Sequence, residues 1–142
     1  MGRFTTGDIE YKFMVAVQSS RAADRFGYLG ETIFYEDEET KEVFSVEIHY
    51  IFDKNDLKYV EKELENIKNN LRDNLEKIDL FFNSRKVYQV EELALFLNKT
   101  AEETFEILHE YADFRLGNKI KECIEQKGKC EFYAEIWKFW DR

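Results

Sequence analysis

The spacing of the apolar residues changes near Asp53, and this change constrains the fold more than any other feature of the sequence. Before it, apolar and polar residues alternate, which is the period of a β-strand. From Leu57 onward the apolar residues recur every three or four positions, as on one face of an α-helix. The 142 residues fit a single domain. The pattern predicts an α+β fold, with an N-terminal antiparallel β-sheet at roughly 8–52, long α-helices at roughly 54–127 and a final short strand at roughly 129–138.

Three segments of the N-terminal part have the pattern of strands: IEYKFMVAVQ at 9–18, ETIFYE at 31–36 and EVFSVEIHYIF at 42–52. In the third, every second residue from Phe44 to Phe52 is apolar, whereas Ser45, Glu47 and His49 lie on the other face. One face of the sheet is therefore expected to be buried and the other to meet water.

The first helical segment is predicted to run without a break for about 27 residues, following Asp53 or Asn55 as its cap. Its apolar seam is Leu57, Val60, Leu64, Ile67, Leu71, Asn74, Ile78 and Phe81. Such a seam is typical of a coiled coil, and a polar Asn on it often fixes the register or the oligomeric state. We expect the seam to form a subunit contact; the other interpretation is a helix that packs on its own sheet, with Asn74 near an exposed end.

The second helical segment contains a short helix that ends at Asn98 and a longer helix that begins with a capping box at Thr100–Glu103. Gly128 is expected to end the longer helix. Gly117 in its middle indicates either a close approach to the backbone or an interruption of the helix. Short helix, turn and capped helix resemble a helix-turn-helix. The second helix, however, begins with a series of carboxylates that phosphates would repel, so we expect no DNA binding.

Composition excludes several other classes. The formal net charge of −9 disfavours a general nucleic-acid binder. No apolar run reaches the roughly 20 residues of a membrane span, and no signal peptide is recognisable, so a cytosolic protein without membrane contact is expected. The spacing of Cys123 and Cys130 does not match a metal site, and both are expected to be reduced and buried. No catalytic, phosphate-loop or dinucleotide motif occurs, which predicts a protein that is not an enzyme and has no cofactor or metal.

Three small clusters have the chemistry of a site for a phosphorylated, nucleotide-like ligand. Arginine forks bind phosphate, aromatic rings stack on bases, and hydroxyl or amide groups bind ribose. The first cluster follows the first predicted strand and contains Gln18, Ser19, Ser20, Arg21, Arg25, Phe26, Gly27 and Tyr28. The second and third contain Arg115, Asn118 and Lys119, and Phe82 and Arg85. For the first cluster the alternative is an ordinary tight turn whose arginines pair with surface glutamates.

The segment GDIEYKFMVAVQSSRAADRFG, residues 7–27, resembles the N-terminal signature of a phage family that defeats the bacterial Thoeris defence. The resemblance implies a sponge, which binds and sequesters the cyclic ADP-ribose-type signal of the defence TIR enzyme without cleaving it. Some members of that family also bind cyclic oligonucleotides at separate sites. The resemblance further implies dimers that build hexamers, with ligand sites between subunits, in the cytoplasm of the infected bacterium. Beyond residue 27 it extends only to the order of elements.

Two alternatives from other classes stay open. The first is an acidic inhibitor, which uses the EDEET turn and the acidic helix face to engage a basic host protein. The second is an enzyme that degrades a nucleotide signal and releases a changed product.

Overall fold

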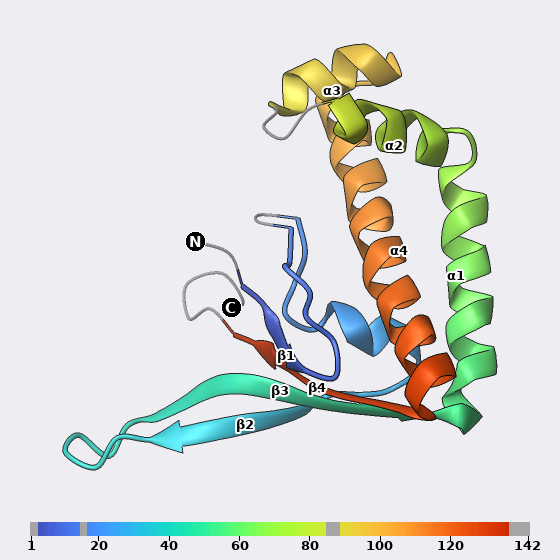
Figure 1. Cartoon of the computed structure of the whole chain (residues 1–142). Coiled ribbons are helices and arrows are strands. Elements are labelled where there is room, and N and C mark those ends of the chain that lie inside the picture. The colour runs from blue at the N-terminus through green and yellow to red at the C-terminus, as the bar shows by residue number, and fades with distance from the viewer. Residues whose placement is uncertain (1–2, 15–16, 85–88, 137–142) are drawn as a thin grey trace.

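The fold is α+β, as the sequence predicts. The computed structural model describes residues 3–14, 17–84 and 89–136. Within these residues the sheet contains four antiparallel strands in the order β1-β4-β3-β2. The elements along the chain are β1 (Thr5–Gly7), β2 (Glu31–Glu36), β3 (Val43–Asp53), α1 (Leu57–Leu71), α2 (Asn74–Ser84), α3 (Val90–Leu97), α4 (Ala101–Lys127) and β4 (Lys129–Glu135). Helices α1 and α4 rise side by side from one end of the sheet, and α2 and α3 lie across their far end (Figure 1).

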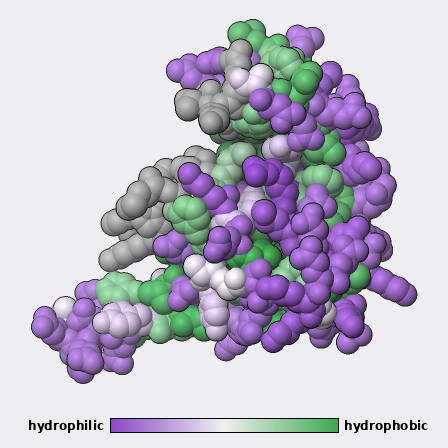
Figure 2. Space-filling view, viewed as in Figure 1, coloured by the Kyte–Doolittle hydropathy of each residue, from purple (hydrophilic) through white to green (hydrophobic). Residues whose placement is uncertain are grey.

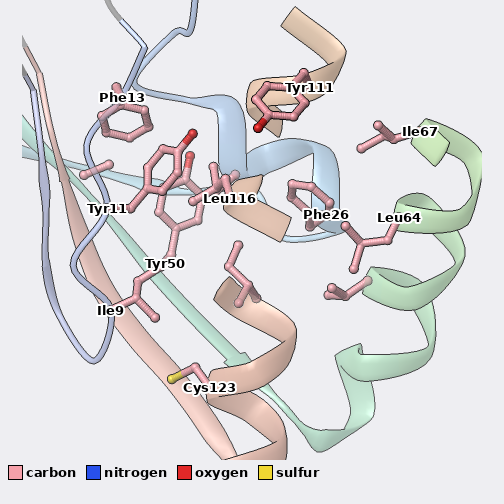
Figure 3. Close-up of a cluster of buried hydrophobic side chains, with 14 of the residues drawn as sticks. Ile9, Tyr11, Phe13, Phe26, Tyr50, Leu64, Ile67, Tyr111, Leu116 and Cys123 are labelled. Atoms are coloured by element: carbon pink, nitrogen blue, oxygen red, sulfur yellow. The ribbon is translucent and has the colours of Figure 1, made fainter. Parts of the chain in front are cut away.

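The hydrophobic core lies between the inner face of the sheet and α4, and it continues between α4 and α1 (Figure 3). Ile48, Tyr50 and Phe52 of β3 are buried there, together with Phe132 of β4. Ser45 on the opposite face is exposed, whereas Glu47 and His49 are half-buried. The alternation in β3 therefore predicted the buried face of the sheet correctly.

The N-terminal segment differs from its prediction. Ile9, Tyr11 and Phe13 are buried at every second position, but no regular strand forms over the described part of 9–18. The segment instead folds back on residues 3–5, where the Phe13 amide donates to the Arg3 carbonyl at 2.8 Å. The first strand is the short β1, which the sequence pattern did not indicate. The alternation of apolar residues predicts which side chains are buried. An extended segment can bury every second side chain whether or not it pairs with another strand.

The predicted long helix is broken into α1 and α2 at Arg72, whose φ of 53° and ψ of −130° end α1. The expectation that its apolar seam forms a subunit contact is wrong. Six of the eight seam residues, Val60, Leu64, Ile67, Leu71, Ile78 and Phe81, are buried within this chain, and Leu57 and Asn74 are half-buried. The bend allows α2 to fold over α4, where the Tyr111 hydroxyl donates to Asp79 Oδ1 at 2.8 Å.

The limits of α4 match their prediction. Thr100 Oγ1 accepts from the Glu103 amide at 3.1 Å, and Gly128 ends the helix in a left-handed conformation. Close packing at Gly117 is also confirmed, since a Cβ there would lie 2.4 Å from the Phe26 ring and 2.6 Å from Leu64. Cys123 and Cys130 are buried free thiols.

Candidate functional site

The predicted cluster at residues 18–28 is a corner whose polar side chains mostly bond to other parts of the chain. Gln18 and Ser20 are buried, at 3% and 1% exposure. The Gln18 Oε1 accepts from the Tyr11 hydroxyl at 2.7 Å, and its Nε2 donates to Asp113 Oδ1 at 3.1 Å. The Ser20 hydroxyl donates to the Glu135 carbonyl at 2.7 Å. These polar groups therefore connect the N-terminal segment to α4 and β4, and their hydrogen bonds are directed into the protein.

Both arginines of this corner are paired with internal acceptors. Arg21 donates to Asp24 Oδ2 at 3.0 Å and to the Thr32 hydroxyl at 2.6 Å. Arg25 contacts three carboxylates, from α1 and α4. Its guanidinium nitrogens lie 3.2 Å from Glu63, 2.8 Å from Glu110 and 3.0 Å from Asp113. The corner thus has the internal pairing expected for the tight-turn alternative.

The charge around Arg25 disfavours an anionic ligand. One guanidinium faces three carboxylates, and the Asp113 side chain is only 2% exposed. Burial raises the pKa of Asp113, despite the hydrogen bonds it accepts from Gln18 and Arg25. Burial also opposes the ionisation of Glu110, but hydrogen bonds from Arg25 and Asn70 keep the pKa of Glu110 below its usual value. A phosphate would have to displace these partners and would meet net negative charge.

The other members of the first cluster also have local roles. Phe26 is fully buried against Gly117 and Leu64, so its prediction as a stacking platform for a base is wrong. Gly27 adopts φ 98°, which favours glycine, and ends the 3₁₀-helix Ala22–Phe26. Half-buried Tyr28 packs its ring 5.5 Å from that of Phe52. The amide of Arg21 donates to the exposed Ser19 hydroxyl at 3.0 Å.

The second cluster forms a cationic face on α4. Arg115 and Lys119 are exposed one turn apart, and Asn118 between them is half-buried. Across the described part of the chain, no carboxylate forms an ion pair with Arg115 or Lys119. These two cations therefore differ from Arg21 and Arg25, which pair with carboxylates of the same chain.

The structure also brings Phe82 to this face. Phe82 at the end of α2 is half-buried and stacks on Tyr111 of α4, with ring centroids 5.8 Å apart and an interplanar angle of 24°. Tyr111 lies one turn before Arg115. Burial raises the pKa of Tyr111 to about 12, and the positive charge of Arg115 partly opposes this rise. Arg85, predicted with Phe82, lies outside the described residues.

The described residues form two pockets that border α4. The first, of about 660 Å³, is lined by residues that were not predicted: Val17, Asn70, Leu71, Phe105, Glu106, Ile107, His109 and Glu110. The second, of about 380 Å³, is lined by Asp8, Ile9, Glu10, Lys119, Glu122, Cys123, Gln126 and Lys127, and so includes one predicted residue. The i, i+4 pairs Phe105–His109 and Glu106–Glu110 were the available sequence signal for the first cavity, because residues at this spacing share a helix face.

No protein-family model, curated protein or solved structure matches this chain. The resemblance over residues 7–27 therefore stays an expectation from the sequence. None of the helices in the described ranges has the length and apolar character needed to cross a membrane.

Proposed function

We propose that the protein binds a cyclic nucleotide signal of the cyclic ADP-ribose type and sequesters it without cleaving it. The observation that carries this proposal is the cationic face of α4. Exposed Arg115 has no carboxylate partner among the described residues, and it lies one turn from Lys119 and one turn from the stacked pair of Phe82 and Tyr111. A cation without an internal partner, beside an aromatic ring, is suited to a phosphorylated ligand with a base.

Each group on this face has a role in the proposed complex. The Arg115 guanidinium binds one phosphate through two parallel N–H donors, and the Lys119 ammonium neutralises the other. The two residues are separated by about 6 Å along the helix axis, which suits a pyrophosphate. The Asn118 amide binds a ribose hydroxyl, and the accessible part of Phe82 contacts the base.

This proposal relocates the ligand site that the sequence favoured. Arg21 and Arg25 hold the corner at residues 18–28, and ligand binding is assigned to Arg115, Asn118, Lys119 and Phe82. The homo-oligomer implied by the resemblance, a dimer that builds to a hexamer, remains part of the proposal. Its contacts must use surfaces other than the seam of α1 and α2, which is buried within the chain. The proposed place of action is the cytoplasm of an infected bacterium.

Isothermal titration calorimetry against cyclic ADP-ribose isomers and cyclic di- and trinucleotides tests the proposal. We expect one of these ligands to bind the unmodified protein, and Arg115→Ala to weaken that binding at least tenfold because a charge-assisted contact is lost. Lys62→Ala removes an exposed cation from α1 and is the matched control, with an expected change of less than twofold. Equal loss in both variants would mean that only the overall charge matters, which contradicts the assigned site.

A further inference from the structure

The hairpin of β2 and β3 extends beyond the helices as an arm, defined here as residues 34–45 (Figure 1). Phe34, Tyr35 and Val43 on this arm are 62%, 54% and 62% exposed. Phe34 lies opposite Ser45 and Tyr35 lies opposite Phe44, so successive apolar residues face opposite sides of the hairpin. Large apolar side chains gathered on a protruding element mark an interaction surface.

The arm also has a free edge. Strand β2 is the last strand of the sheet and, among the described residues, pairs only with β3. Its sequence ETIFYE contains no lysine or proline, the residues that commonly protect edge strands from pairing. A bulge between Ile33 and Phe34 interrupts the register, but the edge strand is still six residues long. An edge of this kind can accept an additional strand through its backbone groups.

The tip of the arm is strongly acidic. Residues 36–42 contain five carboxylates and one lysine, a net charge of −4 in a chain of net charge −9. The tip is hydrophilic, and residues of intermediate and apolar character lie between it and the body of the protein (Figure 2). Asp37 Oδ1 accepts from the amides of Glu39 and Thr40 at 2.9 and 3.0 Å, which fixes the turn. The acidic tip is therefore held in a defined conformation next to the exposed apolar residues.

We propose that this arm docks an extended, basic segment of a partner polypeptide, which adds a strand beside β2. Backbone hydrogen bonds along the edge would supply affinity, apolar side chains of the partner would cover Phe34 and Val43, and its cations would face the acidic tip. A second copy of this chain is a poorer occupant, because it has the same net charge of −9 and its own β2 has a glutamate at each end. This surface is distinct from the cationic face of α4, so the inference does not depend on the proposed function.

A decapeptide of alternating lysine and valine, labelled with a fluorophore, is the probe, and fluorescence anisotropy measures its binding to the full chain. We expect saturable binding that Glu38→Lys/Glu39→Lys weakens at least tenfold. The control Glu65→Lys/Glu125→Lys makes the same change of net charge on exposed parts of α1 and α4, and should weaken it less than threefold. Phe34→Ser/Val43→Ser should also weaken binding at least fivefold, although it leaves the net charge unchanged.

Backbone amide spectra of the protein with this peptide locate the docking surface. The proposal predicts that the largest shifts fall on Glu31–Glu36. Absence of binding, equal losses in the two charge-reversed variants, or shifts centred on α4 would each overturn it. Sedimentation of the protein alone tests whether a second copy of the chain binds the arm. Self-association that Phe34→Ser/Val43→Ser abolishes would assign the arm to a second copy and would also overturn the proposal.

Discussion

Arg25 joins parts of the chain that are far apart in the sequence. Its three carboxylate partners lie 38, 85 and 88 residues further along, on α1 and α4. Local composition showed that the corner at residues 18–28 contains arginines and small polar residues. It did not show that folding places carboxylates around Arg25, or that Phe26 packs on Gly117. The residue types in this corner are therefore compatible with a ligand site or with a tight turn whose arginines pair with carboxylates. The sequence alone did not decide between these two interpretations.

The first prediction concerns the ion pairs of Arg25. Arg25→Ala should lower the free energy of unfolding by about 2 kcal/mol, because it leaves the buried carboxylate of Asp113 without its cation. Urea denaturation followed by circular dichroism measures this change. The matched variant is Arg115→Ala, which should leave stability within about 0.5 kcal/mol of the unmodified protein. An Arg25→Ala protein of unchanged stability would show that the corner does not depend on these ion pairs.

The second prediction concerns the buried Tyr11. Burial raises the pKa of Tyr11 to about 12, although its hydrogen bond to Gln18 opposes the rise. The folded state therefore favours the neutral phenol over the phenolate. This contribution to stability is fully present below the unfolded pKa of about 10 and is lost as the pH rises toward 12. In urea titrations between pH 8 and pH 11.5, stability should fall more steeply for the unmodified protein than for Tyr11→Phe.

The same variant has a second effect at pH 8. Tyr11→Phe should cost about 1 kcal/mol, because it removes the hydroxyl that bonds Gln18 and the Ala112 carbonyl. Parallel pH profiles for the two proteins would contradict a burial-shifted phenol at this position.

At the scale of elements, local sequence signals were sufficient where a cap or an alternation marked the element. β2, β3, the end of α3 at Asn98 and the capping box of α4 all follow from such signals. The break between α1 and α2 does not, because no glycine or proline stands there and the apolar spacing continues through it. The seam of α1 and α2 is buried within this chain because tertiary packing bends the chain at Arg72 and folds α2 over α4.

The third prediction tests this break. Arg72→Gly should raise the free energy of unfolding by about 1 kcal/mol, since Arg72 has φ 53° and ψ −130°, a conformation that glycine adopts without steric cost. In an uninterrupted helix the same substitution would cost about 1 kcal/mol. Chemical denaturation therefore distinguishes a helix that ends at Arg72 from an uninterrupted helix, because the change in the free energy of unfolding has opposite signs in the two cases. The neighbouring exposed control, Asn69→Gly within α1, should be destabilising by about 0.5 to 1 kcal/mol in either case.

At the scale of the whole molecule, charge is unevenly distributed. The acidic arm and the carboxylates around Arg25 hold much of the negative charge, whereas α4 presents Arg115 and Lys119 without ion-pair partners in the described ranges. The proposed function therefore assigns its anionic ligand to this one face, although the chain as a whole is acidic. Binding there should stabilise the folded protein in proportion to the logarithm of ligand concentration. The proposed sequestration needs only tight, reversible binding and no chemical step.

Native mass spectrometry tests the central claim most directly. The unmodified protein is mixed with cyclic ADP-ribose isomers and with cyclic di- and trinucleotides, separated from free ligand, and then heated to release what it has bound. We predict that one of these ligands is retained and then released with its mass unchanged, and that Arg115→Ala retains much less of it. Release of a product of altered mass would identify an enzyme, and retention of none of them would contradict sequestration of a nucleotide signal.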